Sequence, residues 1–289
     1  MQLYSINTGY FKLDGGAMFG VVPKSIWNKV NPADENNLCS WALRCLLIED
    51  GKRLTLIDNG NGDKQDAKFF SHYYLHGDDT LDKSLAKYGF HRDDITDVIL
   101  THLHFDHCGG TIKREGDKLV PNFKNATVWC NAEHWDWAVH PNEREKASFL
   151  KENILPIQEN GQLQFINIPP RQNPVTSLAE VPFADNISLR IVDGHTRGMM
   201  LPQISYKGQT LVFMADLLPS QGHIPLPYVM GYDMFPLTTL QEKKAFLDEA
   251  LTNNYTLFFE HDPKVECCTL QRTEKGIRPD QFFALVDLN

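Results

Sequence analysis

Residues 101–110 (THLHFDHCGG) hold the densest group of chemically capable side chains in the sequence. Within six positions this segment carries His102, His104, Asp106 and His107. The residue composition would produce such a run roughly 0.001 times by chance in a chain of this length. Alternate side chains of an extended segment point the same way, so His102 and His104 can bind one metal ion. A turn after them would present Asp106 and His107 to a second ion.

A segment this short cannot complete two coordination spheres, because zinc takes about four ligands. Three further candidates end apolar runs that read as strands: His195, Asp216 and His261. In open α/β sheets, ligands bind beyond the carboxyl ends of the strands. We therefore expect two divalent metal ions per chain, bridged by Asp216. The assignment is His102, His104 and His195 to the first ion, and Asp106, His107 and His261 to the second.

The chemistry of these ligands suggests both the metal and the reaction. Imidazole and carboxylate without thiolate suit Zn²⁺, with Mn²⁺, Fe²⁺ or Co²⁺ as alternatives. A divalent ion lowers the pKa of bound water from 15.7 toward about 7, so hydrolysis needs no separate strong base. Asp106 and Asp216 are the predicted catalytic carboxylates, with Asp216 as a candidate proton relay. Asp58 ends another strand and is a candidate for orienting a ligand histidine.

The elements that would position these residues alternate between strands and helices. Residues 43–50 and 53–62 read as a strand pair, 80–89 as a helix and 97–102 as a buried strand. In the second half, 188–195, 209–216 and 256–261 read as strands and 236–253 as a helix. This alternation predicts an α/β sheet core.

No repeat or linker divides the sequence, so we expect a single domain over residues 1–289. Two segments depart from the regular pattern. Residues 133–153 read as a helical insert, and residues 217–236 read as a lid-like loop rich in proline, glycine and aromatic residues. Long structured loops in compact domains are often binding loops, so both segments are candidate substrate walls.

The charge balance and the cysteines restrict the partners. The 28 Lys and Arg are outnumbered by 37 Asp and Glu, and the net charge is −9. Binding to phosphates of nucleic acid needs clustered cations, and no basic run is present. The sequence has no signal-peptide pattern, no apolar stretch of roughly 18 residues and no CxxC pair. We expect a cytoplasmic protein with reduced thiols and a small-molecule substrate, without a nucleic-acid or membrane partner; a homodimer is left open.

The order of the motifs resembles that of the metallo-β-lactamase-fold hydrolases. The resemblance lies in HxHxDH at 102–107, GHT at 194–196, AD at 215–216 and the late His261. It implies an α/β fold, an αβ/βα four-layer sandwich of two mixed β-sheets flanked by helices, with a dinuclear site at one edge.

Residues 14–20 (DGGAMFG) and the chain length are most similar to the branch that holds N-acyl homoserine lactonases and methyl parathion hydrolase. Lactonases of that branch usually carry a tyrosine three residues after the bridging aspartate, where this chain has Pro219. Either a residue of the following loop replaces the tyrosine or the substrate is different, and an N-terminal aromatic residue is a candidate pocket wall. The candidate substrate-binding residues are Phe19, His223, Tyr228 and Tyr232.

The leading functional prediction is hydrolysis of a small ester or lactone, N-acyl homoserine lactones included, by a metal-bridging hydroxide. The alternative is phosphotriester hydrolysis of the methyl parathion hydrolase kind, since the same core serves both reactions. Two further functions are disfavoured. A di-iron oxygen or nitric oxide reductase would carry a carboxylate in place of His104 and an attached flavodoxin domain, and a non-catalytic metal-binding scaffold would have lost ligands.

Overall fold

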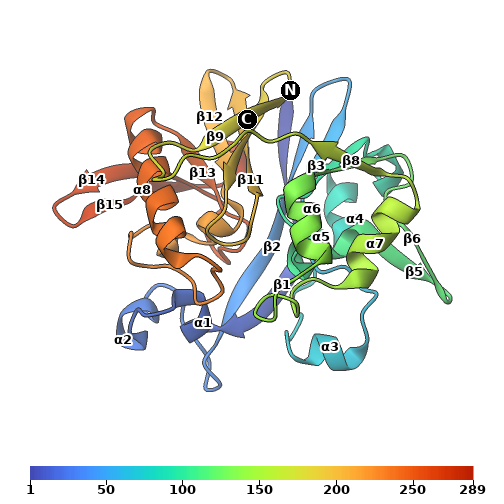
Figure 1. The fold of residues 1–289 in the computed structure, drawn as a ribbon, viewed down its shortest axis with the longest axis horizontal. Coiled ribbons are helices and arrows are strands. Elements are labelled where there is room, and N and C mark those ends of the chain that lie inside the picture. The colour runs from blue at the N-terminus through green and yellow to red at the C-terminus, as the bar shows by residue number, and fades with distance from the viewer. Residues whose placement is uncertain (289) are drawn as a thin grey trace. The chain divides into compact units, whose positions relative to one another are not determined.

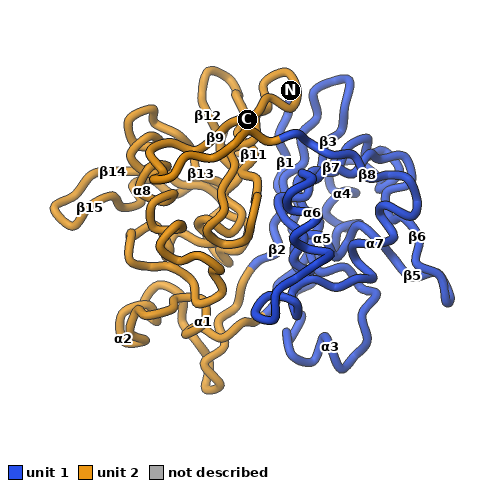
Figure 2. The backbone as a smooth tube through the Cα atoms, in the orientation of Figure 1, with its two compact units in different colours: residues 1–11, 42–167, 289 blue, residues 12–41, 168–288 orange. Residues whose placement is uncertain are grey.

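The computed structural model describes residues 1–288, which form two compact units (Figure 2). Unit 1 contains residues 1–11 and 42–167, and unit 2 contains residues 12–41 and 168–288. The chain passes from unit 1 to unit 2 within its first strand and returns within its second. Each unit has a mixed β-sheet with helices beside it (Figure 1).

The sheet of unit 1 has six strands in the order β1-β2-β3-β4-β7-β8. They are β1 (Gln2–Asp14), β2 (Leu38–Glu49), β3 (Leu54–Ile57), β4 (Asp97–Ile99), β7 (Thr127–Asn131) and β8 (Leu163–Ile166). β2 and β3 are antiparallel, whereas β3, β4, β7 and β8 run parallel. The predicted strand pair and the buried strand that leads to His102 are therefore confirmed.

The helices of unit 1 contribute to its core to different extents, and the first of them has no buried residue. They are α3 (Ala67–Ser71), α4 (Leu81–Lys87), α5 (Phe105–Cys108), α6 (Ala132–Val139) and α7 (Lys151–Glu159), with short 3-10 turns η1 (Arg92–Asp94) and η2 (Gly109–Thr111). Leu85 of α4, Trp135 of α6 and Ile154 of α7 join the same buried cluster as Val98 of β4. A separate hairpin consists of β5 (Ile112–Glu115) and β6 (Lys118–Pro121).

The sheet of unit 2 has seven strands in the order β15-β14-β13-β12-β11-β10-β9. They are β9 (Ala179–Ala184), β10 (Ile187–Val192), β11 (Met199–Tyr206), β12 (Gln209–Phe213), β13 (Thr256–Phe258), β14 (Cys267–Thr273) and β15 (Gly276–Phe283). β12 and β13 are parallel, and the other neighbours are antiparallel. The crossover between β12 and β13 contains α8 (Pro236–Thr252), which packs against β14 and β15. The remaining elements are α1 (Gly15–Phe19), α2 (Lys24–Trp27), η3 (Ala215–Leu217), η4 (Gln221–His223) and η5 (Leu285–Leu288).

The predicted strands are present; β2 begins earlier than its apolar run suggests, and the other strands are shorter than theirs. Each strand that leads to a predicted ligand ends three residues before it: β4 before His102, β10 before His195, β12 before Asp216 and β13 before His261. The ligands therefore lie on loops beyond the carboxyl ends of strands, which is where α/β sheets place their binding residues.

The segment 133–153 contains two helices rather than one continuous insert. α6 ends at Val139, an irregular stretch follows, and α7 begins at Lys151. Pro141 lies just after the end of α6, and proline lacks the N–H that a continuing helix needs. The segment 217–236 is irregular apart from η3, η4 and the first residue of α8, in line with the predicted loop.

The ligand-rich segment rests directly on a glycine-rich loop of unit 1. Asn59 N–H donates to His107 O (2.9 Å), and Gly110 N–H donates to Gly60 O (3.0 Å). A methyl group on Gly109 would overlap the backbone of Asn61, so the two backbones touch where only glycine fits. This contact fixes the height of residues 101–110 above the sheet.

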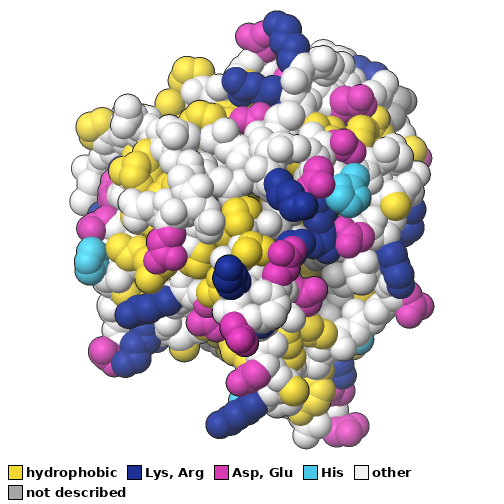
Figure 3. Space-filling view, turned by 90° about the vertical axis from the view of Figure 1, so that its right-hand side faces the viewer, with side chains coloured by type: hydrophobic (Ala, Val, Ile, Leu, Met, Phe, Trp, Pro, Cys, Tyr) yellow, Lys and Arg dark blue, Asp and Glu magenta, His cyan; other side chains and the backbone are white. Residues whose placement is uncertain are grey.

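The surface and the helices give two simple observations about partners. On the face shown in Figure 3, Lys and Arg side chains are interspersed with Asp and Glu side chains. A mixture of this kind differs from the clustered cations that bind phosphate backbones. Among residues 1–288, no helix combines the length and the apolar character needed to cross a membrane.

Candidate metal centre

The protonation of His102 and His104 follows from their hydrogen bonds in unit 1. The Thr101 hydroxyl donates to Asp58 (2.6 Å), so it accepts from Nδ1–H of His102 (3.1 Å). Nε2 of His104 lies 3.0 Å from a carboxylate oxygen of Glu145 and donates to it. The unprotonated nitrogens are therefore Nε2 of His102 and Nδ1 of His104.

These two nitrogens face each other at a distance of 3.0 Å. Two lone pairs at this separation repel each other unless a proton or a cation lies against both. Both side chains are buried, at 0% exposed for His102 and 7% for His104. Imidazole nitrogens that converge in this way fit a divalent transition metal such as Zn²⁺.

A second pair of donors follows on α5. Nε2 of His107 lies 3.7 Å from a carboxylate oxygen of Asp106, and its Nδ1 lies 3.1 Å from Asp58. Asp58 therefore contacts Nδ1 of His107, and Nε2 faces Asp106. Neutral imidazole beside an ionised carboxylate is again a donor set that suits a divalent cation.

The parallel strands β3 and β4 explain why Asp58 lies behind this segment. Leu56 pairs with Val98 in the sheet, so the loops after both strands leave from the same edge. Asp58 has a left-handed backbone conformation with φ of +54°, and its N–H donates to Ile99 O (3.0 Å). Its carboxylate then accepts from the N–H (2.8 Å) and the hydroxyl of Thr101. Asp58 thus lies against His107 of the motif, and its role in orienting a ligand histidine stays a prediction.

Unit 2 brings together the three other predicted ligands. One carboxylate oxygen of Asp216 lies 3.1 Å from Nε2 of His195, and the other lies 3.2 Å from Nε2 of His261. Nδ1 of His195 lies 2.9 Å from Asp233, which is buried. Burial alone would lower the pKa of His195, but the carboxylates of Asp216 and Asp233 outweigh it and raise the pKa to about 10. Without a metal, a proton therefore occupies the place that a cation would take.

The loops of unit 2 hold this group by backbone contacts. His261 N–H donates to Pro219 O (3.1 Å), which ties the end of β13 to the loop after Asp216. Glu242 on α8 is buried and accepts from the N–H groups of Asp193 (2.7 Å) and Gly194 (3.0 Å). α8 therefore fixes the turn that carries His195.

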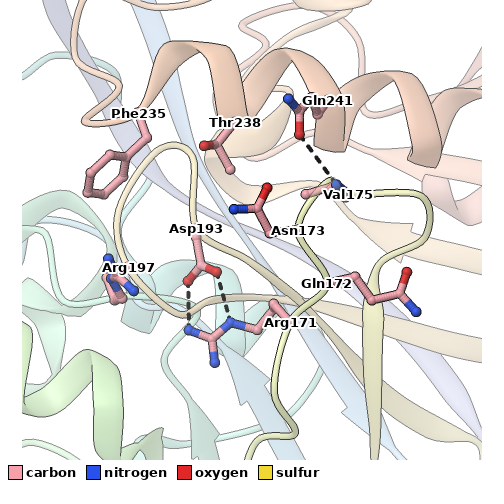
Figure 4. Close-up of a pocket in the computed structure, with 9 residues that line it drawn as sticks. All are labelled: Arg171, Gln172, Asn173, Val175, Asp193, Arg197, Phe235, Thr238 and Gln241. Carbon is pink, nitrogen blue, oxygen red and sulfur yellow. Dashed lines mark hydrogen bonds and ion pairs between the residues drawn. The ribbon is translucent and has the colours of Figure 1, made fainter.

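A cavity of about 360 Å³ adjoins this turn (Figure 4). Arg171 binds the carboxylate of Asp193 through two contacts of 2.8 and 3.0 Å. The guanidinium of Arg197 lies 5.5 Å from the ring centroid of Phe235 at the start of α8. Two guanidinium groups and one carboxylate thus line a cavity next to the loop of His195.

Two residues predicted to contact substrate are packed inside unit 2. The ring of Phe19 is buried between Trp27 (centroid distance 5.4 Å) and His223 (4.5 Å), nearly parallel to both. Nδ1 of His223 accepts from the Ser220 hydroxyl (2.9 Å), and Nε2–H donates to Met18 O (2.9 Å). In this arrangement both nitrogens of His223 are occupied, and the ring joins the 217–236 loop to α1.

The two tyrosines of the same loop are more accessible. Tyr228 is half-buried and meets Phe19 edge to face, with 6.3 Å between the centroids. Tyr232 is 38% exposed. The stretch of the loop that ends at Tyr228 is anchored by Lys243 of α8, whose buried ammonium group donates to Tyr228 O (2.8 Å) and to the carbonyls of Pro225 and Leu226. The substrate roles of these tyrosines stay predictions.

His223 gives a prediction about acid stability. Burial lowers its pKa to about 3, against 6.5 for an ordinary histidine. The unfolded chain then binds more protons than the folded chain between about pH 6.5 and 3, so the stability that neutral His223 provides is lost as the pH falls through this window. In chelator, the difference in free energy of unfolding between wild type and His223→Gln should shrink by about 2 kcal/mol from pH 7.5 to pH 5.0. Urea titrations at both pH values measure it, and a constant difference would contradict the prediction.

Sequence reasoning missed several residues that hold the predicted ligands. They are Glu145 behind His104, Asp233 behind His195, Glu242 beneath the turn before His195, and His134, whose Nε2 accepts from Leu103 N–H (2.8 Å). None of them is adjacent to the ligand it supports, and no local spacing marks them. The only signal was the occurrence of Glu145, His134 and Asp233 in the two segments that depart from the regular pattern, and Glu242 had no such signal.

Comparisons with known proteins place this geometry in a family. The profile of the metallo-β-lactamase superfamily matches residues 44–261. An N-acyl homoserine lactonase of Bacillus thuringiensis is 26% identical over 165 residues, which cover 54% of this chain and 56% of the lactonase. A probable metallo-hydrolase of Mycobacterium bovis is 24% identical over 238 residues, 74% of this chain and 72% of that protein. The chain thus aligns with about half the length of the lactonase.

Solved structures share the fold over almost the whole chain. A probable metal-dependent hydrolase from Staphylococcus aureus has a TM-score of 0.86 and 26% identity, with 98% of this chain and 96% of that chain covered. AidC, a dizinc quorum-quenching lactonase in complex with a product, has a TM-score of 0.77 and 21% identity, with 98% and 95% covered. Since the superfamily profile spans residues 44–261, the chain belongs to the metallo-β-lactamase superfamily.

Proposed function

We propose that this protein is a dinuclear metal-dependent hydrolase that cleaves a small ester or lactone. The observation that carries the proposal is the convergence of imidazole nitrogens and carboxylates within each unit, in the motif order of the superfamily. The two groups of donors together would hold two divalent ions, with Zn²⁺ as the first candidate. His102, His104 and His195 would bind one ion, Asp106, His107 and His261 the other, and Asp216 both.

When bound, such ions polarise a carbonyl oxygen and make a bound water acidic enough to attack near neutral pH. The side chains of this chain would orient the ligands and hold the protons. Asp58, Glu145 and Asp233 keep one proton on the far nitrogen of their histidine, so the near nitrogen stays available. Asp216 has two carboxylate oxygens in contact with histidines and is the residue best placed to hold a proton during turnover.

The relatives support a lactone or ester substrate. The aligned lactonase is named for N-acyl homoserine lactones, and AidC is described as a dizinc lactonase. Pro219 stands where lactonases of this branch usually carry a tyrosine, so another group must hold the substrate carbonyl. Tyr228 and Tyr232 are the proposed replacements, because their side chains are accessible whereas both nitrogens of His223 are engaged.

The test is a side-by-side assay of the full-length protein loaded with Zn²⁺. N-hexanoyl homoserine lactone, an aryl acetate, an aryl phosphotriester and a β-lactam are compared at equal concentration, and bound metal is counted in the same sample. We expect two ions per chain, hydrolysis of the lactone or the ester, and loss of that hydrolysis in chelator. Fewer than two ions, or faster turnover of the phosphotriester than of the lactone and the ester, would overturn the proposal.

A further inference from the structure

We propose that Glu145 is a positioning residue of the metal centre, which sets the tautomer and the basicity of His104; this inference rests on the proposed function. Glu145 lies in the segment 133–153, between α6 and α7, and is 2% exposed. One carboxylate oxygen lies 3.0 Å from Nε2 of His104. The other accepts from the indole N–H of Trp137 (2.7 Å) and the amide of Asn142 (3.2 Å).

The contact has a chemical consequence for the opposite nitrogen of His104. An ionised carboxylate accepts only, so Nε2 of His104 must carry the proton and Nδ1 must present its lone pair. A hydrogen bond to an anionic acceptor also increases the electron density of the imidazole, which makes Nδ1 a stronger donor. That nitrogen is the one that faces His102 at 3.0 Å.

The three histidines of the motif obtain their carboxylates from two sources. Asp58 holds His107 directly and His102 through the hydroxyl of Thr101. Both contacts come from the loop after β3, next to the motif in the sheet. His104 has its own carboxylate, Glu145, which comes from the segment that departs from the regular strand-helix pattern.

The same segment also holds the backbone of the motif. His134 on α6 is fully buried, and its Nε2 accepts from the N–H of Leu103, the residue between His102 and His104. Asn131 caps α6 by accepting from His134 N–H (2.8 Å), which fixes where that ring lies. The segment 133–153 therefore holds the backbone between His102 and His104 through His134, and it holds Nε2 of His104 through Glu145.

A merely structural role for Glu145 makes a different prediction. If the carboxylate only pinned the stretch after α6 through Trp137 and Asn142, its removal would lower stability and leave metal binding intact. If it positions His104, its removal changes the affinity for metal and the electronic spectrum of the bound ion. The two roles are therefore separable by measurements on the metal rather than on turnover.

The experiment compares the full-length wild type with Glu145→Gln. In the variant, the side-chain amide has only one acceptor oxygen. This oxygen can face either His104 or the two donors Trp137 and Asn142, and the NH₂ group then faces the remaining N–H without accepting from it. We expect the affinity for Zn²⁺, measured by chelator competition, to fall about 10- to 100-fold. The visible absorption bands of the Co²⁺-substituted protein should shift as well. Wild-type affinity together with a wild-type Co²⁺ spectrum would overturn the proposal.

Two control variants isolate the carboxylate. Glu143→Gln changes an exposed glutamate that pairs with Lys146, and it should leave the affinity and the Co²⁺ spectrum unchanged. Trp137→Phe removes a donor to Glu145 but keeps the contact with His104, and it should change the affinity by less than about threefold. A loss in Trp137→Phe as large as that in Glu145→Gln would assign the effect to packing of the segment and overturn the proposal.

A measurement on the wild type needs no variant to fold. Histidine-selective ¹⁵N NMR of the metal-free protein should show a proton on Nε2 of His104, and an unprotonated Nε2 would overturn the proposal. The result is separable from the proposed function. If the protein binds two ions and hydrolyses none of the tested substrates, the hydrolase proposal fails while the affinity, spectrum and tautomer results still decide the role of Glu145.

Discussion

Asp216→Asn is expected to abolish hydrolysis and most metal binding together. The carboxylate lies 3.1 Å from His195 and 3.2 Å from His261, so it connects two of the three predicted ligands of unit 2. Asparagine keeps the shape but removes the charge and one acceptor oxygen. We expect kcat/KM to fall roughly 10³-fold, equivalent to about 4 kcal/mol of transition-state stabilisation. Steady-state kinetics and metal analysis of the same preparation measure both effects.

The matched control for this variant is Asp248→Asn. Asp248 is a more exposed carboxylate of unit 2 that pairs with Lys244 and Arg272, and it should retain wild-type turnover and metal content. The metal-free stability of Asp216→Asn should stay within about 2 kcal/mol of wild type, because the substitution is isosteric. Wild-type turnover in Asp216→Asn would refute the ligand assignment.

Asp58→Asn is expected to weaken both the fold and the metal centre. Asp58 is fully buried and accepts three hydrogen bonds, two from Thr101 and one from His107. Asparagine would turn its NH₂ toward one of these donors and leave that donor unsatisfied. We expect a loss of about 2–4 kcal/mol in the free energy of unfolding in chelator. The affinity for Zn²⁺ should fall about 10- to 100-fold, because the tautomer of His107 is no longer fixed.

Asp63→Asn is the control from the same loop, since Asp63 is exposed. This variant should change neither the free energy of unfolding nor the affinity for Zn²⁺ by a measurable amount. Urea titration in chelator separates the fold from the metal, and chelator competition measures the affinity. A destabilised Asp58→Asn protein with wild-type affinity would confine Asp58 to a structural role.

The elements of the fold were predictable where local pattern and burial agree. The strand that leads to His102 is a short buried run, and the helix at 236–253 has regular apolar spacing; both are present as β4 and α8. The exact strand ends were not predictable. Apolar side chains continue past Ile99 and Phe258, but the chain leaves the sheet there to form the ligand loops. Hydropathy records burial, and a buried loop looks the same as a buried strand.

The aromatic residues mark a second limit. Phe19 and His223 lie 204 positions apart in the chain and stack at 4.5 Å inside unit 2. A sequence gives only the residue types, and an aromatic ring beside a site can line a pocket or fill a core. Whether a ring lines a pocket or fills a core depends on which side chains pack around it. Here Trp27 stacks on Phe19, and Ser220 and Met18 O form hydrogen bonds with His223.

The sequence by itself determined the candidate metal ligands and the superfamily, because the ligands occupy a contiguous motif and the positions just after apolar strands. Only the tertiary structure revealed the carboxylates that hold those ligands. Each of these carboxylates lies about 40 or more positions from the histidine that it holds: Asp58 from His107, Glu145 from His104 and Asp233 from His195. The physical reason is that a hydrogen bond between buried groups depends on how loops pack, whereas a contiguous motif needs only its own local backbone.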